Sequence, residues 1–397
     1  MMQKLLVYCW GSLSEPPLCA GLEKLGVNYV KYAEPMKDYH GDGAFAQKFI
    51  SFIHENKVEA VFSYDYFPLI SMICEINKLP YISWIYDCPQ YTLQSETLGS
   101  AYNYIFCFDR MYTERLQAQG AVNCFHFPLG SESASVERLF ARCSENSQTA
   151  EKFRCDVSFV GNFYNDSKNR LRQAKLSPYA TGYVEGLIRS QMLVYGYNFL
   201  RDSLPGNVAE EIVKKCALSL GKGYVQDDLQ MAADALGMEV TAREREAVVK
   251  VLGETTNMVV YTSSKLSESL QSGSVLIKGY ADYDNEVPLI FRESRINLNV
   301  TSRTIESGIP QRVFDILNCG GFCLTNYQPE VAQYFEDGQE LVMYSSFEDL
   351  AWKVQYYLTH EEERAQIARN GKEKMRREFE LALRLSEMLR TVEVTNK

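Results

Sequence analysis

Short apolar runs alternate with longer amphipathic segments along the first third of the chain. The apolar runs are too short for helices and predict buried strands, whereas the segments between them repeat apolar residues at helical spacing. Strands that alternate with helices form a parallel sheet with helices on both faces. We therefore expect an N-terminal Rossmann-like α/β domain in residues 1–150. Its expected strands are 4–10, 27–33, 58–63, 80–85, 104–108 and 122–127, and its expected helices are 14–25, 44–56, 67–77 and 110–119.

A second α/β pattern follows a polar segment, residues 131–152, which we interpret as a linker. The apolar strand 155–161 opens this unit, and the polar helical runs of about 170–253 contain no clear strand. We interpret those runs as a helical insertion in a second Rossmann-like domain, residues 151–375. Further strands of this domain are expected at 258–262, 275–279, 296–301, 322–325 and 341–344.

The end of the chain is charged and amphipathic. We expect two helices between residues 361 and 389, and the pair Asn370-Gly371 is the expected break between them. Residues 376–397 then form a separate C-terminal helix.

The densest group of polar residues interrupts an apolar helix–strand pattern at 309–326. Pro310 suits the first turn of a helix, and Gly320-Gly321 can end that helix through a positive φ angle. Apolar residues at helical spacing leave three polar side chains near the exposed edge, Gln311, Arg312 and Asp315. Beside a strand end, Arg312 can hold a phosphate and Asp315 a ribose hydroxyl. The alternative is a surface ion pair worth a few tenths of a kcal/mol.

Composition narrows the class of protein. The chain has 397 residues, 46% of them hydrophobic, with a formal net charge of −10 and a pI of about 5.2. This balance argues against general nucleic-acid binding and against adhesion to anionic membranes. Eleven cysteines without a Cys-x-x-Cys pair predict free thiols, and four histidines outside any metal-ligand pattern predict no metal site. The N-terminal apolar run is too short for a signal peptide or a transmembrane segment, so we expect a cytoplasmic protein.

Two turns of the first domain carry candidate chemistry. Gly11, Ser12 and Glu15 lie between a strand and a helix, where free N–H groups can bind an anion or a hydroxyl; the alternative is an ordinary capped turn. Asp87 follows a buried strand and is a candidate general base, although it could simply cap a turn. Asp65, between Tyr64 and Tyr66, occupies a similar position with a weaker case. His126, at another strand end, is a second, weak base candidate, although a lone histidine among aromatic residues is more often structural.

Further donor candidates lie in the second domain. Lys168 or Arg170, in the loop after the strand 155–161, could reach a diphosphate, or form a solvated basic pair. The loop of Tyr283 could hold a nucleobase by stacking. Arg303, Ser307 and Gly308 belong to the polar cluster that precedes Pro310.

Residues 294–375 resemble the C-terminal half of CgeB-like bacterial glycosyltransferases, which have the GT-B fold. The resemblance rests on Arg303–Ser307, Gly308–Asp315, Cys319–Phe322, Leu324–Tyr327, Tyr334–Gly338, Glu362–Arg364 and Ile367–Gly371. The earlier stretches Tyr81–Trp84, Asp87–Pro89 and Val157–Gly161 are similar to the DUF3880-type N-terminal region of the same proteins.

The resemblance implies two Rossmann-like domains that face each other across a cleft. The C-terminal domain would bind a nucleotide-sugar donor and the N-terminal domain an acceptor, and the final helix would cross back to the first domain. A carboxylate at the place of Asp315 would hold the ribose hydroxyls, although Glu is commoner there. Ser307 stands where many retaining relatives carry a second Glu.

We therefore expect a metal-independent hexosyltransferase that uses a nucleoside-diphosphate sugar, preferably a UDP-sugar, and no other cofactor. The acceptor would be a saccharide, protein or surface polymer, in cell-surface, spore-coat or protein glycosylation. A sugar-nucleotide epimerase and a non-catalytic carbohydrate- or nucleotide-binding protein are the alternatives. The expected donor-binding residues are Asp315, Arg312, Gln311, Arg303, Ser307, Gly308, Asn326, Tyr283, Lys168 and Arg170. The expected acceptor-binding residues are Gly11, Ser12 and Glu15.

Overall fold

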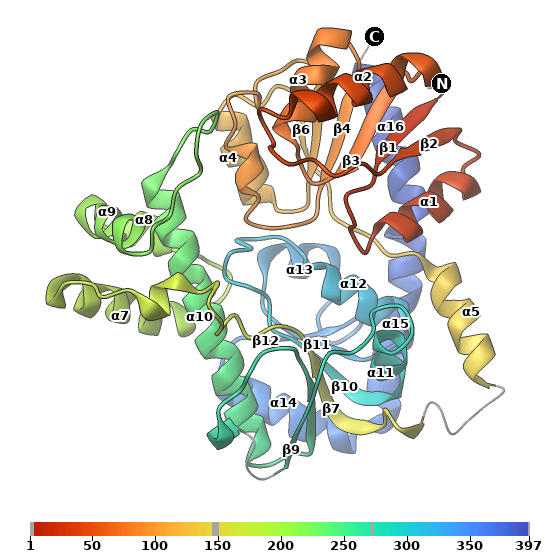
Figure 1. The fold of residues 1–397 in the computed structure, drawn as a ribbon. Helices are drawn as coiled ribbons and strands as arrows, with labels where there is room; N and C mark the ends of the chain where they lie inside the picture. The colour runs from red at the N-terminus through yellow and green to blue at the C-terminus, as the bar shows by residue number, and fades with distance from the viewer. Residues whose placement is uncertain (1–3, 145–150, 271–273, 396–397) are drawn as a thin grey trace. The chain divides into compact units, whose positions relative to one another are not determined.

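The computed structural model describes residues 4–144, 151–270 and 274–395, which form two compact units (Figure 1). Unit 1 contains the chain up to Glu132, the segment Leu220–Gln226 and the chain from Phe379 onward. Unit 2 contains Ser133–Ser219 and Asp227–Glu378. Each unit has its own six-stranded sheet. In the described ranges, no helix is both long and apolar enough to cross a membrane.

All six strands of unit 1 run parallel, in the order β2-β1-β3-β4-β5-β6. Every strand that the sequence pattern predicts here is confirmed to within two residues at each end. The register pairs Tyr8 with Ser63 and Tyr64 with Trp84, so β1, β3 and β4 end at one edge of the sheet. The strands are β1 (Leu5–Tyr8), β2 (Tyr29–Tyr32), β3 (Ala60–Tyr64), β4 (Tyr81–Ile85), β5 (Asn103–Cys107) and β6 (Cys124–His126).

Helices cover both faces of this sheet. The connection from β1 leads to β2 on one side, whereas the later connections all lead toward the other side of the sheet. Right-handed crossovers that run in opposite directions place their helices on opposite faces. The core of one face joins Phe49 of α2, Ile70 of α3 and Leu116 of α4 to apolar strand residues. On the other face, α1 packs closely on α16: a Cβ at Gly21 would lie 2.7 Å from the Leu385 side chain. The helices are α1 (Glu15–Lys24), α2 (Gly43–Asn56), α3 (Pro68–Asn77), α4 (Arg110–Ala118) and α16 (Leu381–Thr395), with a 3-10 turn η1 (Tyr91–Leu93).

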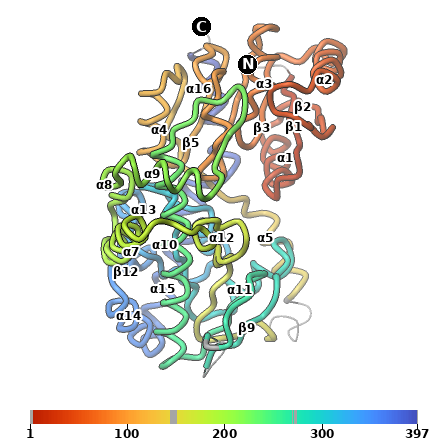
Figure 2. Tube along the Cα trace, turned by 60° about the vertical axis from the view of Figure 1, so that its left-hand side comes forward, coloured from red at the N-terminus to blue at the C-terminus, as the bar shows by residue number. Residues whose placement is uncertain are grey.

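Two segments from later in the chain complete unit 1. Residues 220–226 run beside the loop after β4, where Val225 N–H donates to the Gln94 oxygen at 2.7 Å (Figures 1 and 2). Ser131 and Phe379 are joined by a backbone hydrogen bond of 3.1 Å at the start of the C-terminal segment. Unit 1 is therefore assembled from three separate stretches of sequence.

The unit 2 sheet is also parallel, in the order β12-β11-β10-β7-β8-β9. Leu298 of the central strand β10 pairs with Leu324 on one side and with Phe159 on the other, so the carboxyl ends of β7, β10 and β11 lie together. The strands are β7 (Cys155–Val160), β8 (Met258–Tyr261), β9 (Val275–Lys278), β10 (Ser294–Asn299), β11 (Cys323–Asn326) and β12 (Val342–Tyr344).

The long helix α10 (Asp228–Gly253) organises the helical insertion of unit 2. It carries Val248, Val249 and Leu252 into the sheet core, while α7, α8 and α9 pack along its outer part. The insertion elements are η2 (Arg170–Gln173), α7 (Pro178–Met192), α8 (Leu200–Ser203) and α9 (Gly206–Lys215). The remaining elements are α5 (Ser133–Ser144), η3 (Glu268–Leu270), α11 (Val287–Glu293), α12 (Gln311–Asn318), α13 (Pro329–Tyr334), α14 (Phe347–Thr359) and α15 (Glu361–Glu378).

The connections differ from the sequence-based expectation in three places. The expected linker 131–152 contains the helix α5, and its residues 145–150 lie outside the described part. The first of the three stretches of unit 1 ends at Glu132, whereas the sequence pattern led us to expect the domain boundary at residue 150. The expected break at Asn370-Gly371 is wrong, because α15 continues through it; a Cβ at Gly371 would lie 2.1 Å from the Glu340 oxygen, so this glycine permits close packing.

Candidate functional site

The helix α12 follows β10 at the carboxyl edge of the unit 2 sheet, with Pro310 as its N-cap. Its C-terminal end is confirmed at the glycine pair. Gly320 has a φ of +74°, and a Cβ at Gly321 would lie 2.5 Å from the Phe291 oxygen. The turn requires glycine at the first position, and close packing requires it at the second. The first turn of α12, which follows Pro310, lies beside the strand ends.

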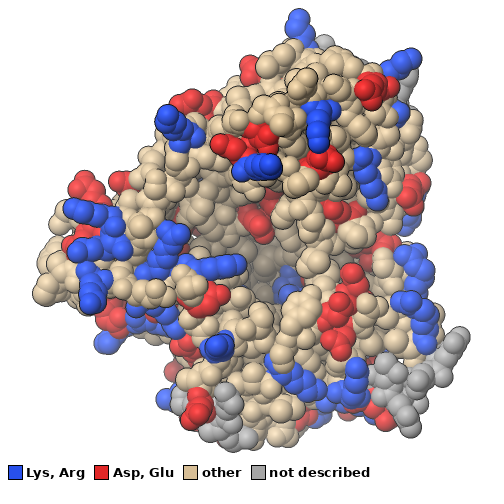
Figure 3. Space-filling model, viewed as in Figure 1, with Lys and Arg blue, Asp and Glu red and all other residues tan. Residues whose placement is uncertain are grey.

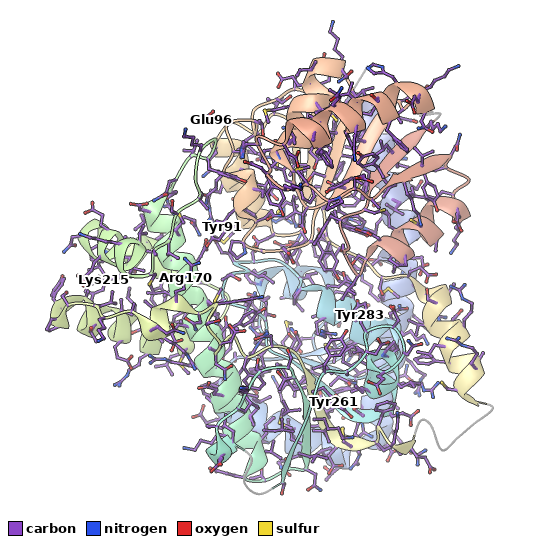
Figure 4. All side chains as sticks on the ribbon, in the orientation of Figure 1. Tyr91, Glu96, Arg170, Lys215, Tyr261 and Tyr283 are labelled. Atoms are coloured by element: carbon purple, nitrogen blue, oxygen red, sulfur yellow. The ribbon has the colours of Figure 1, made fainter. Side chains whose placement is uncertain are left out.

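Asp315 is the centre of a polar cluster on α12. Its carboxylate accepts hydrogen bonds from Tyr283 Oη at 3.0 Å and from Gln311 Nε2 at 2.8 Å. Arg312 Nη1 lies 3.6 Å from Asp315 Oδ2. Four residues that the sequence singled out thus meet in space, and Tyr283 lies beside α12 in Figure 4.

The expectation that Asp315 lies at an exposed edge is wrong, because only 9% of the residue is accessible. The helix α12 is covered by α15 as well as by the sheet, so its polar face also lies inside. Burial raises the pKa of Asp315, and the nearby Arg312 partly offsets that rise. A buried carboxylate at a strand edge, held by neutral donors and one cation, is a preformed acceptor of hydrogen bonds.

Arg245 on α10 is a second cation at this edge. Its Nη2 donates to the Val300 oxygen at 2.6 Å, and its Nη1 bonds the Asn162 oxygen, so it joins the ends of β10 and β7. The guanidinium also lies 5.0 Å from the Tyr164 ring centroid. Burial lowers the pKa of Arg245, and the positive charge of Arg312 adds to this effect. Two neighbouring guanidinium groups create a local positive potential despite the acidic chain as a whole.

Arg303 is held inside unit 2 by a carboxylate. Its Nε donates to Glu244 Oε2 at 2.7 Å, and its Nη2 donates to Oε1 of the same residue at 2.5 Å. Only 5% of Arg303 is exposed, and its guanidinium also lies 4.7 Å from the Tyr195 ring centroid. The structure therefore places Arg303 as an internal support of the loop after β10.

Lys168 and Arg170 lie on the exposed surface of the insertion. Arg170 Nη1 donates to the Ala217 oxygen at 2.8 Å, just after the end of α9, where carbonyl groups attract a cation. Lys and Arg side chains are numerous over the insertion in Figure 3, and Figure 4 labels Arg170 and Lys215 there. Neither Lys168 nor Arg170 makes a described contact with the Asp315 cluster.

Ser307 lies against a carboxylate that comes from another helix. Its Oγ donates to Glu330 Oε1 at 2.7 Å, and both residues are buried, at 4% and 1% exposure. Glu330 N–H donates back to the Ser307 oxygen at 3.2 Å. Gly308, also buried, follows directly in the chain. Asn326 Oδ1 accepts from Thr301 N–H at 2.7 Å and so joins the ends of β11 and β10.

The turn after β1 does not offer the free N–H groups that the sequence suggested. Glu15 Oε1 accepts hydrogen bonds from the backbone N–H of Trp10 at 2.8 Å and of Gly11 and Ser12 at 2.9 Å each. The expectation that the N–H groups of Gly11 and Ser12 are free for an anion or a hydroxyl is therefore wrong, because the Glu15 carboxylate already accepts both. Ser14 makes no side-chain cap at this helix.

Asp65 and Asp87 form a carboxylate pair at the carboxyl edge of unit 1. Asp65 is 2% exposed, has a φ of +58°, and accepts the N–H groups of Tyr86 and Asp87 on Oδ1, both at 3.0 Å. Three hydroxyls converge on its backbone oxygen, from Ser63, Ser83 and Tyr81. Burial, with the charge of Asp87, raises the pKa of Asp65 to about 7. Asp87 is exposed, and desolvation raises its pKa as well.

His126 is the last residue of β6 and pairs with Cys107 across the sheet. It is partly exposed and lies two strands away from β4, which carries Asp87 at its end. In the described part of the chain, no three His, Cys, Asp or Glu side chains gather as a metal-binding group. The eleven cysteines all lie in the described ranges and form no disulfide there, and seven of them are buried.

The sequence did not reveal two of these features, Arg245 and Glu330. Arg245 appeared in a charged helical run, where nothing distinguishes a buried arginine from a solvated one. Glu330 lies 23 residues from Ser307. Asp65, by contrast, was a weaker candidate beside Asp87 because it also follows a strand of the parallel sheet, and the structure joins the two residues by a hydrogen bond.

Known proteins share the fold of this chain. Residues 239–390 match the family model described as Glycosyl transferase-like. No curated protein matches the chain. HepE from Anabaena, solved in complex with UDP and glucose, shares 10% identity with a TM-score of 0.55, over 99% of this chain and 100% of its own.

Two further solved structures are similar over nearly their whole length. Sucrose-phosphate synthase from Thermosynechococcus elongatus has a TM-score of 0.57 at 9% identity, with 99% of each chain covered. A glycosyltransferase from Rickettsia africae has a TM-score of 0.55 at 9% identity, over 100% of this chain and 99% of its own. At such low identity the likeness establishes the fold. The chain has the GT-B fold, and its residues 239–390 are similar to Glycosyl transferase-like proteins.

Proposed function

We propose that this protein transfers a sugar from a nucleoside-diphosphate sugar to an acceptor hydroxyl. The observation that carries the proposal is the cluster of Asp315, Arg312 and Arg245 at the carboxyl edge of β7 and β10. This cluster lies inside the segment that matches the glycosyltransferase-like family. Unit 2 would hold the donor and unit 1 the acceptor.

The two arginines fit a diphosphate. Transfer breaks the bond between the anomeric carbon and the diphosphate oxygen, and negative charge develops on that oxygen. Arg312, in the first turn of α12, and Arg245, beneath the strand ends, would stabilise this charge. Their combined charge is the reason to propose a reaction that needs no metal ion.

Asp315 fits the ribose. A carboxylate has about four lone-pair sites, and the hydrogen bonds from Gln311 and Tyr283 use two of them. The others can accept from two vicinal hydroxyls. Tyr283 would position this carboxylate and border the nucleobase. HepE, of the same fold, was solved with UDP and glucose, which makes a UDP-sugar the first donor to test.

Asp87 is the proposed base on the acceptor side. It is exposed at a strand end, and Asp65 fixes its backbone from below. Asp87 would take the proton of the acceptor hydroxyl as the new glycosidic bond forms. The raised pKa of Asp87 brings its basicity closer to neutral pH, where a general base is most effective.

We infer that the protein is a CgeB-like hexosyltransferase that acts in cell-surface, spore-coat or protein glycosylation. Arg303, Ser307, Gly308 and Asn326 would shape the donor site from within, through the contacts described above, rather than touch the diphosphate. Lys168 and Arg170 would have no part in donor binding.

A thermal-shift panel tests the function. UDP-, GDP-, dTDP- and CDP-sugars are added separately to the full-length protein, and we expect one nucleotide class to raise the melting temperature. Incubation with that donor alone then separates transfer from epimerisation, since an epimerase isomerises the sugar without an acceptor. No shift with any nucleotide would support a protein that does not bind nucleotide sugars.

A further inference from the structure

Two exposed aromatic rings lie on one buried ring at the carboxyl edge of unit 1. Trp10 follows β1 and is 41% exposed, and Tyr39 follows β2 and is 42% exposed. Both contact Phe67, which is 5% exposed, with ring centroids 6.2 Å and 5.4 Å from it. We call Trp10, Tyr39 and Phe67 the aromatic platform.

The platform is held in place by hydrogen bonds to its backbone and edges. Trp10 Nε1 donates to the Tyr64 oxygen at 2.9 Å, one residue before Asp65. The Tyr39 oxygen accepts from Leu69 N–H at 2.7 Å. Large rings that are already fixed lose little conformational entropy when a ligand covers them. The platform is therefore a preorganised apolar surface that is exposed to solvent.

Polar groups border the platform. Asp38, next to Tyr39, accepts N–H groups from His40 at 2.8 Å and from Gly41 at 3.1 Å, and these bonds lower its pKa. Asp38 thus stays ionised at neutral pH and keeps capacity for further hydrogen bonds. The segments 9–15 and 33–42 carry four carboxylates against one lysine. Such a surface repels a phosphate group and attracts neutral hydroxyls.

We propose that the aromatic platform binds a pyranose ring of a neutral saccharide, which makes a saccharide the acceptor class. The C–H face of a pyranose packs on an aromatic ring, and its equatorial hydroxyls find acceptors at the ring's border. Trp10 is linked through Tyr64 to Asp65, and Asp65 holds Asp87, so the platform and the proposed base share one bonded network. This inference rests on the proposed function.

A second exposed tryptophan, in unit 2, must be replaced before the fluorescence of Trp10 can be measured alone. Trp352 on α14 is 60% exposed and stacks on Tyr356 at 5.2 Å, far along the chain from the platform. The third tryptophan, Trp84, is 1% exposed. In the variant Trp352→Phe, quenching of fluorescence by acrylamide therefore reports on Trp10.

The experiment measures this quenching with maltose, cellobiose, N,N′-diacetylchitobiose or glucose 6-phosphate added to the Trp352→Phe protein. We expect at least one neutral disaccharide to lower the quenching constant of Trp10 at least twofold. The added change Tyr39→Ala should abolish the protection, whereas Tyr39→Phe, which retains the ring, should preserve it. Protection by none of the neutral sugars, by glucose 6-phosphate alone, or to an equal extent in Tyr39→Ala would overturn the inference.

Calorimetry with UDP separates this result from a failure of the proposed function. If UDP binds and no neutral sugar protects Trp10, the platform assignment falls and the donor site stands. If neutral sugars protect Trp10 but UDP does not bind, glycosyl transfer falls and the saccharide site stands. Tyr39→Ala, which lies in unit 1, should leave UDP affinity unchanged.

Discussion

Replacing Asp315 by Asn removes one charge from the proposed ribose site and leaves its shape. The carboxylate is buried and accepts from Tyr283 and Gln311. An alanine would leave both donors without an acceptor, at about 1–3 kcal/mol each. Asparagine avoids this, because the Gln311 amide can turn its oxygen to the new NH₂ group and the tyrosine hydroxyl can rotate.

The expected loss of donor affinity follows from the hydrogen bonds. A hydrogen bond to a charged group contributes about 1.5–3 kcal/mol, and the amide has one acceptor oxygen where the carboxylate has two. With about 1.4 kcal/mol for each tenfold change, Asp315→Asn should weaken UDP binding roughly ten- to hundredfold.

Stability should move the other way. Because burial raises the folded-state pKa of Asp315, the folded protein releases this proton at a higher pH than the unfolded chain does. The ionised carboxylate therefore lowers the free energy of unfolding above that window. The neutral amide removes this penalty, so the melting temperature at pH 8 should be equal or higher.

Calorimetry with UDP, paired with thermal unfolding at pH 8, measures both effects. The control is Asp284→Asn, an exposed residue of the Tyr283 loop, which should bind UDP as the wild type does. Wild-type UDP affinity in a folded Asp315→Asn protein would refute the ribose assignment.

Three other changes test separate parts of the structure. Arg245→Lys keeps the charge but loses the planar fork, so we expect UDP affinity to fall about tenfold by calorimetry; an unchanged affinity would remove Arg245 from the donor site. The pKa of Asp65 rises from 3.8 to about 7 on folding, so the free energy of unfolding should fall across that pH window, by up to ~4 kcal/mol. In Asp65→Asn, the free energy of unfolding, measured in urea, should no longer fall across this pH window, and transfer should slow because the backbone of Asp87 is held less firmly. An unaltered pH dependence would contradict the raised pKa of Asp65. Gly371→Ala should cost about 3 kcal/mol or more of stability through overpacking, whereas Gly186→Ala in open space on α7 should stabilise by about 0.5–1 kcal/mol; similar melting temperatures for the two variants would contradict the close packing of α15.

The strands and most helices were predictable because their signal is local. Each strand of unit 1 is an apolar run between turn residues, and the pair Gly320-Gly321 marks the end of α12. Gly371 misled because a glycine between polar residues looks like a break, whereas its role depends on Glu340 across a helix contact. The burial of Asp315 was also missed, since periodicity shows which face is apolar but not whether another helix covers the polar face.

The site residues depended more strongly on distant partners. Arg303 pairs with Glu244, 59 residues earlier, so an arginine that looked free to bind a phosphate is internal. The Glu15 side chain accepts hydrogen bonds from the backbone of the turn that precedes its own helix. This contact depends on the backbone conformation of Trp10–Ser12, which the sequence pattern does not show. The meeting of Tyr283 with Asp315 was not foreseen as a contact, although both residues were singled out.

The central claim is that unit 2 binds a nucleotide through Asp315 and the two arginines. A crystal structure of the full-length protein with UDP tests it most directly. We predict the ribose hydroxyls at the Asp315 carboxylate and the diphosphate at Arg312 and Arg245. UDP bound at another place, with these three side chains left without contact to it, would contradict the account.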